Sequence, residues 1–241
     1  MNDFYLSIII PAYKEEERIH IILEAIAKYE KTKNFKIETI VVADASPDKT
    51  VEKAKEFTDR LRSLAIIDNK VNKGKGGAVR EGILASHGQY VLFADADNST
   101  PIEQADKLLR YVDQYEVVIG SRYCADGRLA VPQSFVRIMG SRGLNAIIRL
   151  LAVSGIKDTQ CGFKLFESKA AKAIFSRQTI TGFSFDIEIL AIAKKLGFKI
   201  KEAGIIWYDN PHSTVSPIKD GLRMVSDSWE VRKNILKGVY R

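Results

Sequence analysis

The residues with the clearest capacity for chemistry are two aspartates, Asp95 and Asp97, which directly follow the apolar run at residues 90–94. Two carboxylates in this position repel each other unless a cation lies between them. Mg²⁺ and Mn²⁺ prefer one or two carboxylates together with phosphate oxygens, and an ion held in this way would stabilise a diphosphate as a leaving group. The alternative is a turn that caps a helix starting near Pro101. The D-x-D pattern alone leaves both interpretations open.

Two other expected strand ends lead into segments with polar side chains. The first strand runs into Pro11-Ala12-Tyr13-Lys14-Glu15, and the second ends in Asp44. A carboxylate at the end of a strand can accept a hydrogen bond from the ring NH of a base. The alternative for Asp44 is an Asx turn, which the following sequence Ser46-Pro47-Asp48 favours.

The segment NKGKGG at residues 72–77 places Lys75 and Gly76 at the expected start of a helix, where backbone NH groups favour anions. It is not a Walker A loop, because no Gly-Lys-Ser/Thr follows. It also departs from the G-x-G-x-x-G pattern, because Val79 stands where the third glycine should be. The alternative is a solvated turn, since lysines commonly face water.

The elements that must position these residues alternate between strand and helix. Short β-branched or apolar runs predict strands at residues 6–10, 37–43, 64–67, 90–94 and 117–120. Helical spacing predicts helices at residues 15–29, 50–64, 76–86 and 102–112. This order predicts an α/β fold with a doubly wound, mostly parallel sheet and helices on both faces. Ligands of such sheets collect beyond the carboxyl ends of the strands, where the polar residues gather.

The second half of the chain is less regular. We expect a helix at residues 133–153, a strand at 164–166, a helix at 187–196 and a strand at 199–207. Residues 1–215 are predicted to form one domain, and residues 216–241 a C-terminal amphipathic helical tail. The apolar positions of this tail are Leu222, Val225, Trp229 and Leu236, at spacings of 3, 4 and 7. That face suits either a bilayer surface or the closing of the domain core.

Composition narrows the functional classes. The chain has 241 residues, of which 46% are hydrophobic and 28% charged, as in ordinary globular proteins. Two cysteines cannot form a disulfide framework, and neither a signal peptide nor a membrane-spanning run is expected, so we predict a cytoplasmic location. The net charge of +7 suits an anionic partner, such as a nucleotide, a lipid phosphate or a membrane surface.

The motifs together resemble a family-2 glycosyltransferase of the GT-A type, and most closely the polyprenyl (dolichyl) phosphate sugar synthases. The matching strings, in order, are SIIIPAYKEEERI, VVADASPDKT, NKGKGGAVREG, FADADNSTP, VIGSRY, DTQCGFKLF and FSFDIEIL, followed by Trp207 ahead of HSTV. The resemblance extends from about Leu6 to Val215. It implies a GT-A fold for residues 1–215.

The resemblance also implies roles for the matching positions. The nucleotide sugar would be held by Pro11, Ala12, Tyr13, Glu15, Asp44, Lys75, Gly76, Asp95 and Ala96. Asp95 and Asp97 would bind Mg²⁺ or Mn²⁺. Ser99 stands at a third ligand position, where the mannose synthases often have Gln, and the sequence S-T-P looks more like the glucosyl branch, which uses UDP-glucose. The residues implied in catalysis are Asp97, Asp186, Arg122 and Arg137, and the two arginines would hold the acceptor phosphate.

The implied reaction is displacement at the anomeric carbon of the sugar with inversion. A hydroxyl acceptor needs a general base within reach, whereas a phosphate monoester is already anionic at neutral pH. Asp186 stands where the wider family has a catalytic carboxylate. With a phosphate acceptor it would instead orient other groups. Its alternative is to cap the helix that follows.

Several alternatives remain open from the sequence. The donor could be GDP-mannose instead of UDP-glucose, and the acceptor a carbohydrate hydroxyl instead of a lipid phosphate. A sugar-nucleotide pyrophosphorylase would need a glycine-rich loop after the first strand, which Pro11-Ala12-Tyr13 does not supply. A nucleic-acid binder would need a basic stripe, whereas the basic residues here accompany acidic ones. We therefore predict no nucleic-acid partner. We also predict a contact with the cytoplasmic face of a membrane.

Overall fold

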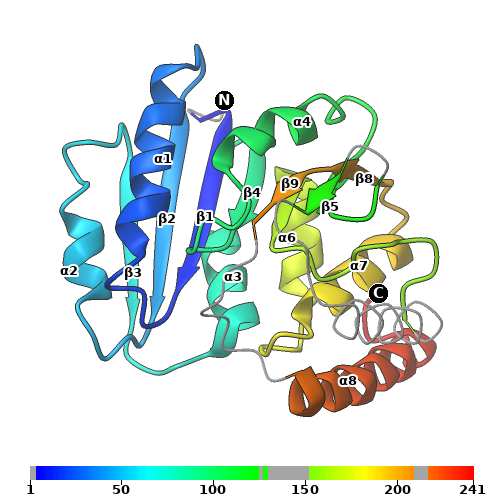
Figure 1. Ribbon diagram of the computed structural model, residues 1–241. Coiled ribbons are helices and arrows are strands. Elements are labelled where there is room, and N and C mark those ends of the chain that lie inside the picture. The colour runs from blue at the N-terminus through cyan, green and yellow to red at the C-terminus, as the bar shows by residue number, and fades with distance from the viewer. Residues whose placement is uncertain (1–3, 125–126, 130–151, 209–216) are drawn as a thin grey trace.

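The computed structural model describes residues 4–124, 127–129, 152–208 and 217–241 (Figure 1). Within these residues, seven strands form one sheet in the order β3-β2-β1-β4-β7-β5-β8. The strands are β1 (Leu6–Ala12), β2 (Ile37–Asp44), β3 (Leu64–Asn69), β4 (Tyr90–Ala94), β5 (Val117–Ser121), β7 (Phe163–Glu167) and β8 (Ile200–Gly204). Neighbouring strands are parallel except at β7, which runs antiparallel between β4 and β5. The predicted mostly parallel sheet is confirmed.

Helices cover both faces of this sheet (Figure 1). One face carries α1 (Ile19–Lys31), α2 (Thr50–Lys55), a 3₁₀ turn (Ile102–Gln104) and α4 (Ala105–Leu109). The other carries α3 (Gly74–Ala85), α6 (Ser168–Ser176) and α7 (Phe185–Lys195), and α8 (Pro217–Lys237) packs against α7. A small second sheet pairs β6 (Arg128–Leu129) with β9 (Ile206–Trp207). The doubly wound arrangement is therefore also confirmed.

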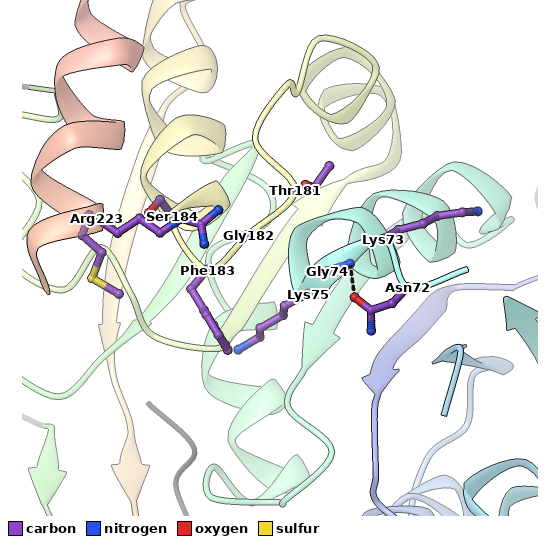
Figure 2. Close-up of a pocket in the computed structure, with 10 residues that line it drawn as sticks. Asn72, Lys73, Gly74, Lys75, Thr181, Gly182, Phe183, Ser184 and Arg223 are labelled. Atoms are coloured by element: carbon purple, nitrogen blue, oxygen red, sulfur yellow. Dashed lines mark hydrogen bonds between the residues drawn. The ribbon is translucent and has the colours of Figure 1, made fainter. Parts of the chain in front are cut away.

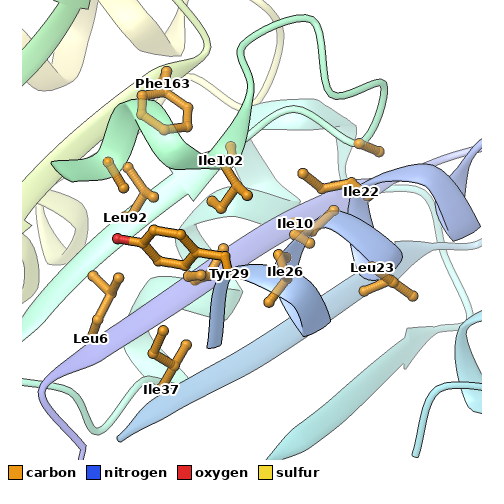
Figure 3. Packing of buried hydrophobic residues seen from close by; sticks show 14 of the residues in the cluster. Leu6, Ile10, Ile22, Leu23, Ile26, Tyr29, Ile37, Leu92, Ile102 and Phe163 are labelled. Atoms are coloured by element: carbon orange, nitrogen blue, oxygen red, sulfur yellow. The ribbon is translucent and has the colours of Figure 1, made fainter. Parts of the chain in front are cut away.

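The core follows from the apolar patterns of the sequence. Every residue of β2 and β4 is buried, as expected for central parallel strands. Ile22 and Ile26 of α1 lie one turn apart and pack over β1, where Ile10 faces them (Figure 3). Burying each such side chain contributes about 1.5–3 kcal/mol. Tyr29 closes this cluster, and its hydroxyl donates a hydrogen bond to Asp106 at 2.7 Å.

Several predicted boundaries differ from the structure. The helix predicted at 50–64 ends at Lys55 and continues as turns, and the helix predicted at 102–112 is a 3₁₀ turn followed by a single short helix, α4. The strand predicted at 199–207 is divided at Ile205 into β8 and β9, which belong to different sheets. Helix α6 was not predicted. Most of the helix predicted at 133–153 lies outside the described residues.

The C-terminal helix forms as predicted, but it packs through a different face. The side chains that turn toward α7 include Met224, Ser228 and Val231. Three of the four apolar residues that predicted the amphipathic helix are instead exposed: Leu222 by 71%, Trp229 by 51% and Leu236 by 76%. The idea that these residues close the core is therefore wrong. None of the described helices combines the length and apolarity that a membrane span requires, and the boundary predicted at 215/216 stays a prediction.

Candidate active site

Several of the predicted functional residues that the structure describes lie where the sheet opens between β1 and β4. These two strands are paired only as far as Ile9 and Phe93, whereas β1 and β2 stay paired to Ala12 and Ala43. The two halves of the sheet therefore separate at their carboxyl ends. The strand order 3-2-1-4 also reverses direction at this point, and open α/β sheets bind their ligands in the crevice at such a reversal.

The loops after β1 and β2 are fastened to each other. The backbone NH of Lys14 donates to Ser46 Oγ at 3.0 Å, and that of Glu15 donates to Thr50 Oγ1 at 2.9 Å. Lys14 and Ala45 have φ angles of 58° and 56°, in the left-handed region that disfavours side chains with a Cβ. Such a conformation costs on the order of 1 kcal/mol per residue and persists where surrounding contacts fix it, often at functional sites.

The residues predicted to frame the base lie along this edge. Pro11 and Ala12 end β1, and the Tyr13 side chain beyond them is 47% exposed. Asp44 is buried at the end of β2, and its Oδ1 accepts a hydrogen bond from the backbone NH of Lys73 at 2.8 Å. Asp44 thus holds the loop after β3 against the end of β2, through a partner well outside its own turn. Its role toward a base stays a prediction.

Glu15 is held by Arg18, whose Nε and Nη2 donate to its two carboxylate oxygens at 2.9 and 2.8 Å. Burial raises the pKa of Glu15, Arg18 lowers it, and the charges of Asp97 and Asp95 raise it further, with a net increase. The influence of both aspartates indicates that Glu15 belongs to the same acidic edge of the sheet.

The start of α3 brings a lysine to the acidic pair. Lys75 Nζ lies 2.7 Å from Asp95 Oδ1. Burial would lower the pKa of Lys75, but Asp95, Asp186 and Asp97 outweigh it and the pKa is raised. The backbone NH of Asp95 donates to the carbonyl of Gly162 at 3.2 Å, and a Cβ at Gly162 would lie only 2.0 Å from Asp95 Oδ2. Asp95 is therefore confined between a cation and a glycine that leaves room for it.

Gly76 has a packing role next to this lysine. Its backbone NH donates to the carbonyl of Thr181 at 2.8 Å, and a Cβ at Gly76 would lie 2.6 Å from Phe185 Cβ. Only glycine permits α3 to approach the first residue of α7 this closely. Nucleotide binding by Gly76 stays a prediction.

For Asp97 the sequence left open a turn residue or a member of a cation-binding carboxylate pair, and its position is compatible with both. Its Oδ1 accepts a hydrogen bond from the backbone NH of Ser99 at 2.9 Å, and Asn98 between them has a φ of 53°. The turn therefore exists, and it fixes Asp97 beside Asp95. Ala96 and Ser99 are both buried, at 4% and 8% exposure.

The donor set suits a divalent ion that a ligand completes. Among the described residues, no group of three or more His, Cys, Asp or Glu side chains gathers in metal-binding geometry. Two carboxylates are what Mg²⁺ uses when substrate phosphates supply further oxygens. The Lys75 ammonium beside Asp95 shows that this position already stabilises a positive charge. Asp95 and Asp97 therefore fit Mg²⁺ or Mn²⁺, whereas Ser99 as a third ligand stays a prediction.

Asp186 lies in the first turn of α7 and is almost fully buried. It forms an ion pair with Lys164 of β7, a lysine with no exposed surface, whose Nζ also donates to the carbonyl of Cys161 at 2.6 Å. Burial raises the pKa of Asp186, and Lys164 and Lys75 offset only part of this increase. The alternative that Asp186 caps α7 is wrong, because Ser184 occupies the N-cap position.

Arg122, directly after β5, is oriented by a residue that sequence reasoning missed. Its Nε and Nη2 each donate to a carboxylate oxygen of Asp158 at 2.8 Å, and its backbone NH donates to the same group at 2.9 Å. Burial alone would raise the pKa of Asp158, but Arg122 outweighs it and the pKa is lowered. The bonds to Asp158 leave Nη1 for another acceptor. Arg137, the other predicted phosphate ligand, lies outside the described residues.

A cavity of about 360 Å³ adjoins this cluster. It lies between the start of α3, the segment before α7 and the first described side chains of α8 (Figure 2). Figure 2 shows the Phe183 and Lys75 side chains meeting at one wall, and the ammonium lies 5.9 Å from the ring centroid. Arg223 extends from α8 toward Ser184 at the opposite wall. Lys75 is therefore shared between this cavity and the acidic pair.

The fold and this arrangement of acidic and basic groups agree with a family match. Residues 7–175 match the family model described as Glycosyl transferase family 2. The chain belongs to glycosyltransferase family 2. This confirms the resemblance in the sequence motifs and identifies the protein as a glycosyltransferase.

Curated relatives and solved structures extend this assignment. A protein of Dictyostelium discoideum called "Dolichyl-phosphate beta-glucosyltransferase" is 35% identical over 100% of this chain and 78% of its own length. The protein of the same name from Drosophila melanogaster is 36% identical over 98% of this chain and 77% of its own. The structure of glucosyl-3-phosphoglycerate synthase from Mycobacterium tuberculosis with Mn²⁺ and UDP has a TM-score of 0.64 at 17% identity, covering 98% and 80% of the two chains. This last likeness confirms the GT-A-like fold alone.

Proposed function

We propose that this glycosyltransferase moves glucose from UDP-glucose onto the phosphate of a polyprenyl or dolichyl phosphate, with inversion at the anomeric carbon. The names of the curated relatives support this donor sugar and acceptor. The observation that carries the acceptor class is the buried ion pair of Asp186 with Lys164. A hydroxyl acceptor needs a base that can take its proton, whereas a phosphate monoester needs none.

The chemistry consists of one displacement. An oxygen of the acceptor phosphate forms a bond to the anomeric carbon, while the bond from that carbon to the β-phosphate oxygen of UDP breaks. Arg122, held by Asp158, would present Nη1 to the acceptor phosphate, and Arg137 is its proposed second ligand. Positioning and electrostatic stabilisation would then supply most of the rate acceleration.

Asp95 and Asp97 are the residues that would hold Mg²⁺ or Mn²⁺. A bound ion would offset the charge that develops on the departing diphosphate. Lys75 lies close enough to Asp95 to add a second positive charge at the same place. We expect EDTA to abolish turnover and either metal to restore it. Full activity of a metal-free sample would contradict this role for the two carboxylates.

A donor and acceptor panel tests the proposal directly. The protein is incubated with Mg²⁺ or Mn²⁺ and UDP- or GDP-sugars, with and without a polyprenyl phosphate, and nucleotide release is measured. UDP release from UDP-glucose that depends on the lipid phosphate is the expected result. GDP release from GDP-mannose would replace the glucosyl assignment with a mannosyl one.

Two substitutions distinguish the acceptor classes. Arg122→Ala should lower turnover strongly with a lipid phosphate, and Asp186→Asn should leave measurable turnover because no base is needed. Circular dichroism must first establish that both variants are folded. Loss of activity in Asp186→Asn with a mild effect of Arg122→Ala would favour a carbohydrate hydroxyl.

We also propose that the exposed face of α8 contacts the cytoplasmic surface of a membrane, where a polyprenyl phosphate resides. Leu222, Trp229 and Leu236 form an apolar row there, and basic residues such as Lys233 and Lys237 lie on the same helix. Apolar and basic side chains together suit an anionic lipid surface. Leu236→Ser should weaken sedimentation with anionic vesicles, whereas Ile21→Ser on α1, also an exposed apolar site, should not. Equal binding by both variants would contradict this contact.

A further inference from the structure

We propose that Arg223 of α8 binds the phosphate of the acceptor in the cavity of Figure 2, so that the C-terminal helix forms part of the acceptor site. This inference rests on the function proposed above and assigns a residue that none of the family motifs contains. It makes α8 a contributor to substrate recognition in addition to its packing on α7.

The geometry places Arg223 at the wall of this cavity. It lines the cavity together with Met224, opposite Lys75 and the loop before it. Its Nη2 lies 3.8 Å from the position that a Cβ at Gly182 would occupy, so the guanidinium reaches across to the segment before α7. Within the described residues, Arg223 has no hydrogen-bond or ion-pair partner.

Charge indicates the kind of ligand. Lys73, which also lines the cavity, forms an ion pair with Glu81 at 3.0 Å, and Lys75 forms one with Asp95 at 2.7 Å. Among the described residues that line the cavity, Arg223 is therefore the cationic side chain that forms no ion pair with a carboxylate. A guanidinium matches phosphate oxygens in pairs, whereas a neutral hexose offers it no charge. Since Lys75 links the cavity to the acidic pair, a phosphate bound at Arg223 lies on the side of the site where the donor's diphosphate is expected.

The rim of the cavity suits the rest of a lipid acceptor. The Phe183 side chain at its wall is 43% exposed. Leu222, next to Arg223 on α8, is 71% exposed. A volume of about 360 Å³ is near the lower end for small-molecule sites, so it suits a phosphate head group more than a whole nucleotide sugar. An isoprenoid chain would extend out of the cavity across the apolar rim and lie along α8.

Steady-state kinetics of Arg223→Ala test the inference, with farnesyl phosphate as the acceptor. Loss of hydrogen bonds to a charged group predicts that KM for farnesyl phosphate rises about 10- to 100-fold, while KM for UDP-glucose stays within about twofold. Arg223→Lys should recover part of the loss, because the charge remains but the paired geometry does not. Arg232→Ala is the matched control. It removes the same type of side chain from an exposed position of the same helix, about 14 Å away along its axis.

Binding measurements add a readout that does not depend on turnover. Calorimetry should show that farnesyl phosphate binds more tightly to the wild-type protein than to the Arg223→Ala protein. Farnesol should bind to neither protein measurably. Inorganic phosphate should compete weakly with farnesyl phosphate if the phosphate supplies the main contact. Competition as strong as that of farnesyl phosphate itself would show a free-phosphate site and overturn the lipid assignment.

The outcomes separate this inference from the proposed function. If the wild type uses farnesyl phosphate and Arg223→Ala behaves as wild type, the function stands and the role of Arg223 is wrong. If Arg223→Ala raises KM for UDP-glucose instead, the cavity holds the donor and the inference is overturned. If the wild type shows no turnover with any lipid phosphate, the proposed function fails, and the inference fails with it.

Discussion

Removal of the buried lysine on β7 should destabilise the protein in a strongly pH-dependent way. Lys164 has no exposed surface, and the Asp186 side chain that it pairs with is 5% exposed. In Lys164→Met the methylenes of the side chain are largely replaced, but the ammonium is lost. Asp186 then remains as a buried carboxylate without its nearest cation, and the carbonyl of Cys161 loses a donor.

The magnitude follows from these contacts. Breaking a buried ion pair by removing one partner costs about 3–5 kcal/mol, and an unsatisfied carbonyl adds about 1 kcal/mol. Burial already raises the pKa of Asp186, and loss of Lys164 raises it further. A carboxyl group whose pKa is raised in the folded state does not lower the free energy of unfolding at pH values below its unfolded pKa, near 3.9. The full loss of stability is present only at pH values above the folded pKa. The variant should therefore lose about 4–6 kcal/mol at about pH 8 and much less at about pH 4.

Urea denaturation followed by circular dichroism at these two pH values measures the effect. Lys195→Met, an exposed lysine at the end of α7, is the control and should change stability by less than about 0.5 kcal/mol. A double variant with Lys164→Met and Asp186→Leu should recover most of the loss, because no buried charge remains. An equal loss at both pH values, or a loss below about 1 kcal/mol, would refute the reasoning.

Two further predictions concern the neighbourhood of the acidic pair. Gly162→Ala should fold with nearly normal stability but lose most activity, because its Cβ would force the flexible Asp95 side chain, 2.0 Å away, out of position. Normal turnover together with normal thermal unfolding would contradict that role of Gly162. Burial raises the pKa of Cys161 to about 12, so at about pH 8 its thiolate fraction is on the order of 10⁻⁴. Iodoacetamide should therefore label Cys124, which is partly exposed, and leave Cys161 unlabelled in the folded protein, as mass spectrometry can measure; rapid labelling of Cys161 would show that its pocket opens.

The parts of the fold that sequence predicted best are those governed by local pattern. The β-branched runs of β1 and β2 and the spacing of Ile19, Ile22 and Ile26 indicate strand and helix without reference to the rest of the chain. The antiparallel insertion of β7 had no local signal, because the direction of a strand depends on which partners it meets. Lys164, the second residue of that strand, even argued against a central position, because lysine is seldom fully buried.

The C-terminal helix shows why an apolar pattern can be assigned to the wrong surface. Its inward face includes Ser228, which is buried because its hydroxyl donates to the carbonyl of Met224 at 2.6 Å. A hydrogen bond within the helix removes the cost of burying a serine, so hydrophobicity alone could not identify this face. The apolar residues left outside are the ones that the pattern had selected.

The candidate site divides in the same way. Motifs identified Asp95, Asp97 and Arg122 as candidate site residues, because their types suit phosphate chemistry. Asp158 and Lys164, which orient two of the predicted residues, lie 36 and 22 positions away from Arg122 and Asp186. No periodicity or spacing connects such partners. Both residues stand in the matching string DTQCGFKLF, but their pairing with Arg122 and Asp186 becomes visible only when the chain is folded.

The place of β7 between β4 and β5 has a consequence for the order in which the protein can assemble. β4 and β5 are complete by residue 121, but the strand that joins them begins only at Phe163. While the chain is being synthesised, both strands have an open edge for some forty further residues, which takes about 2–8 s at ordinary translation rates. Unpaired edges are templates for pairing with other chains. A ribosome that pauses in this interval therefore exposes the nascent protein to self-association at the same strand whose end carries the acidic pair.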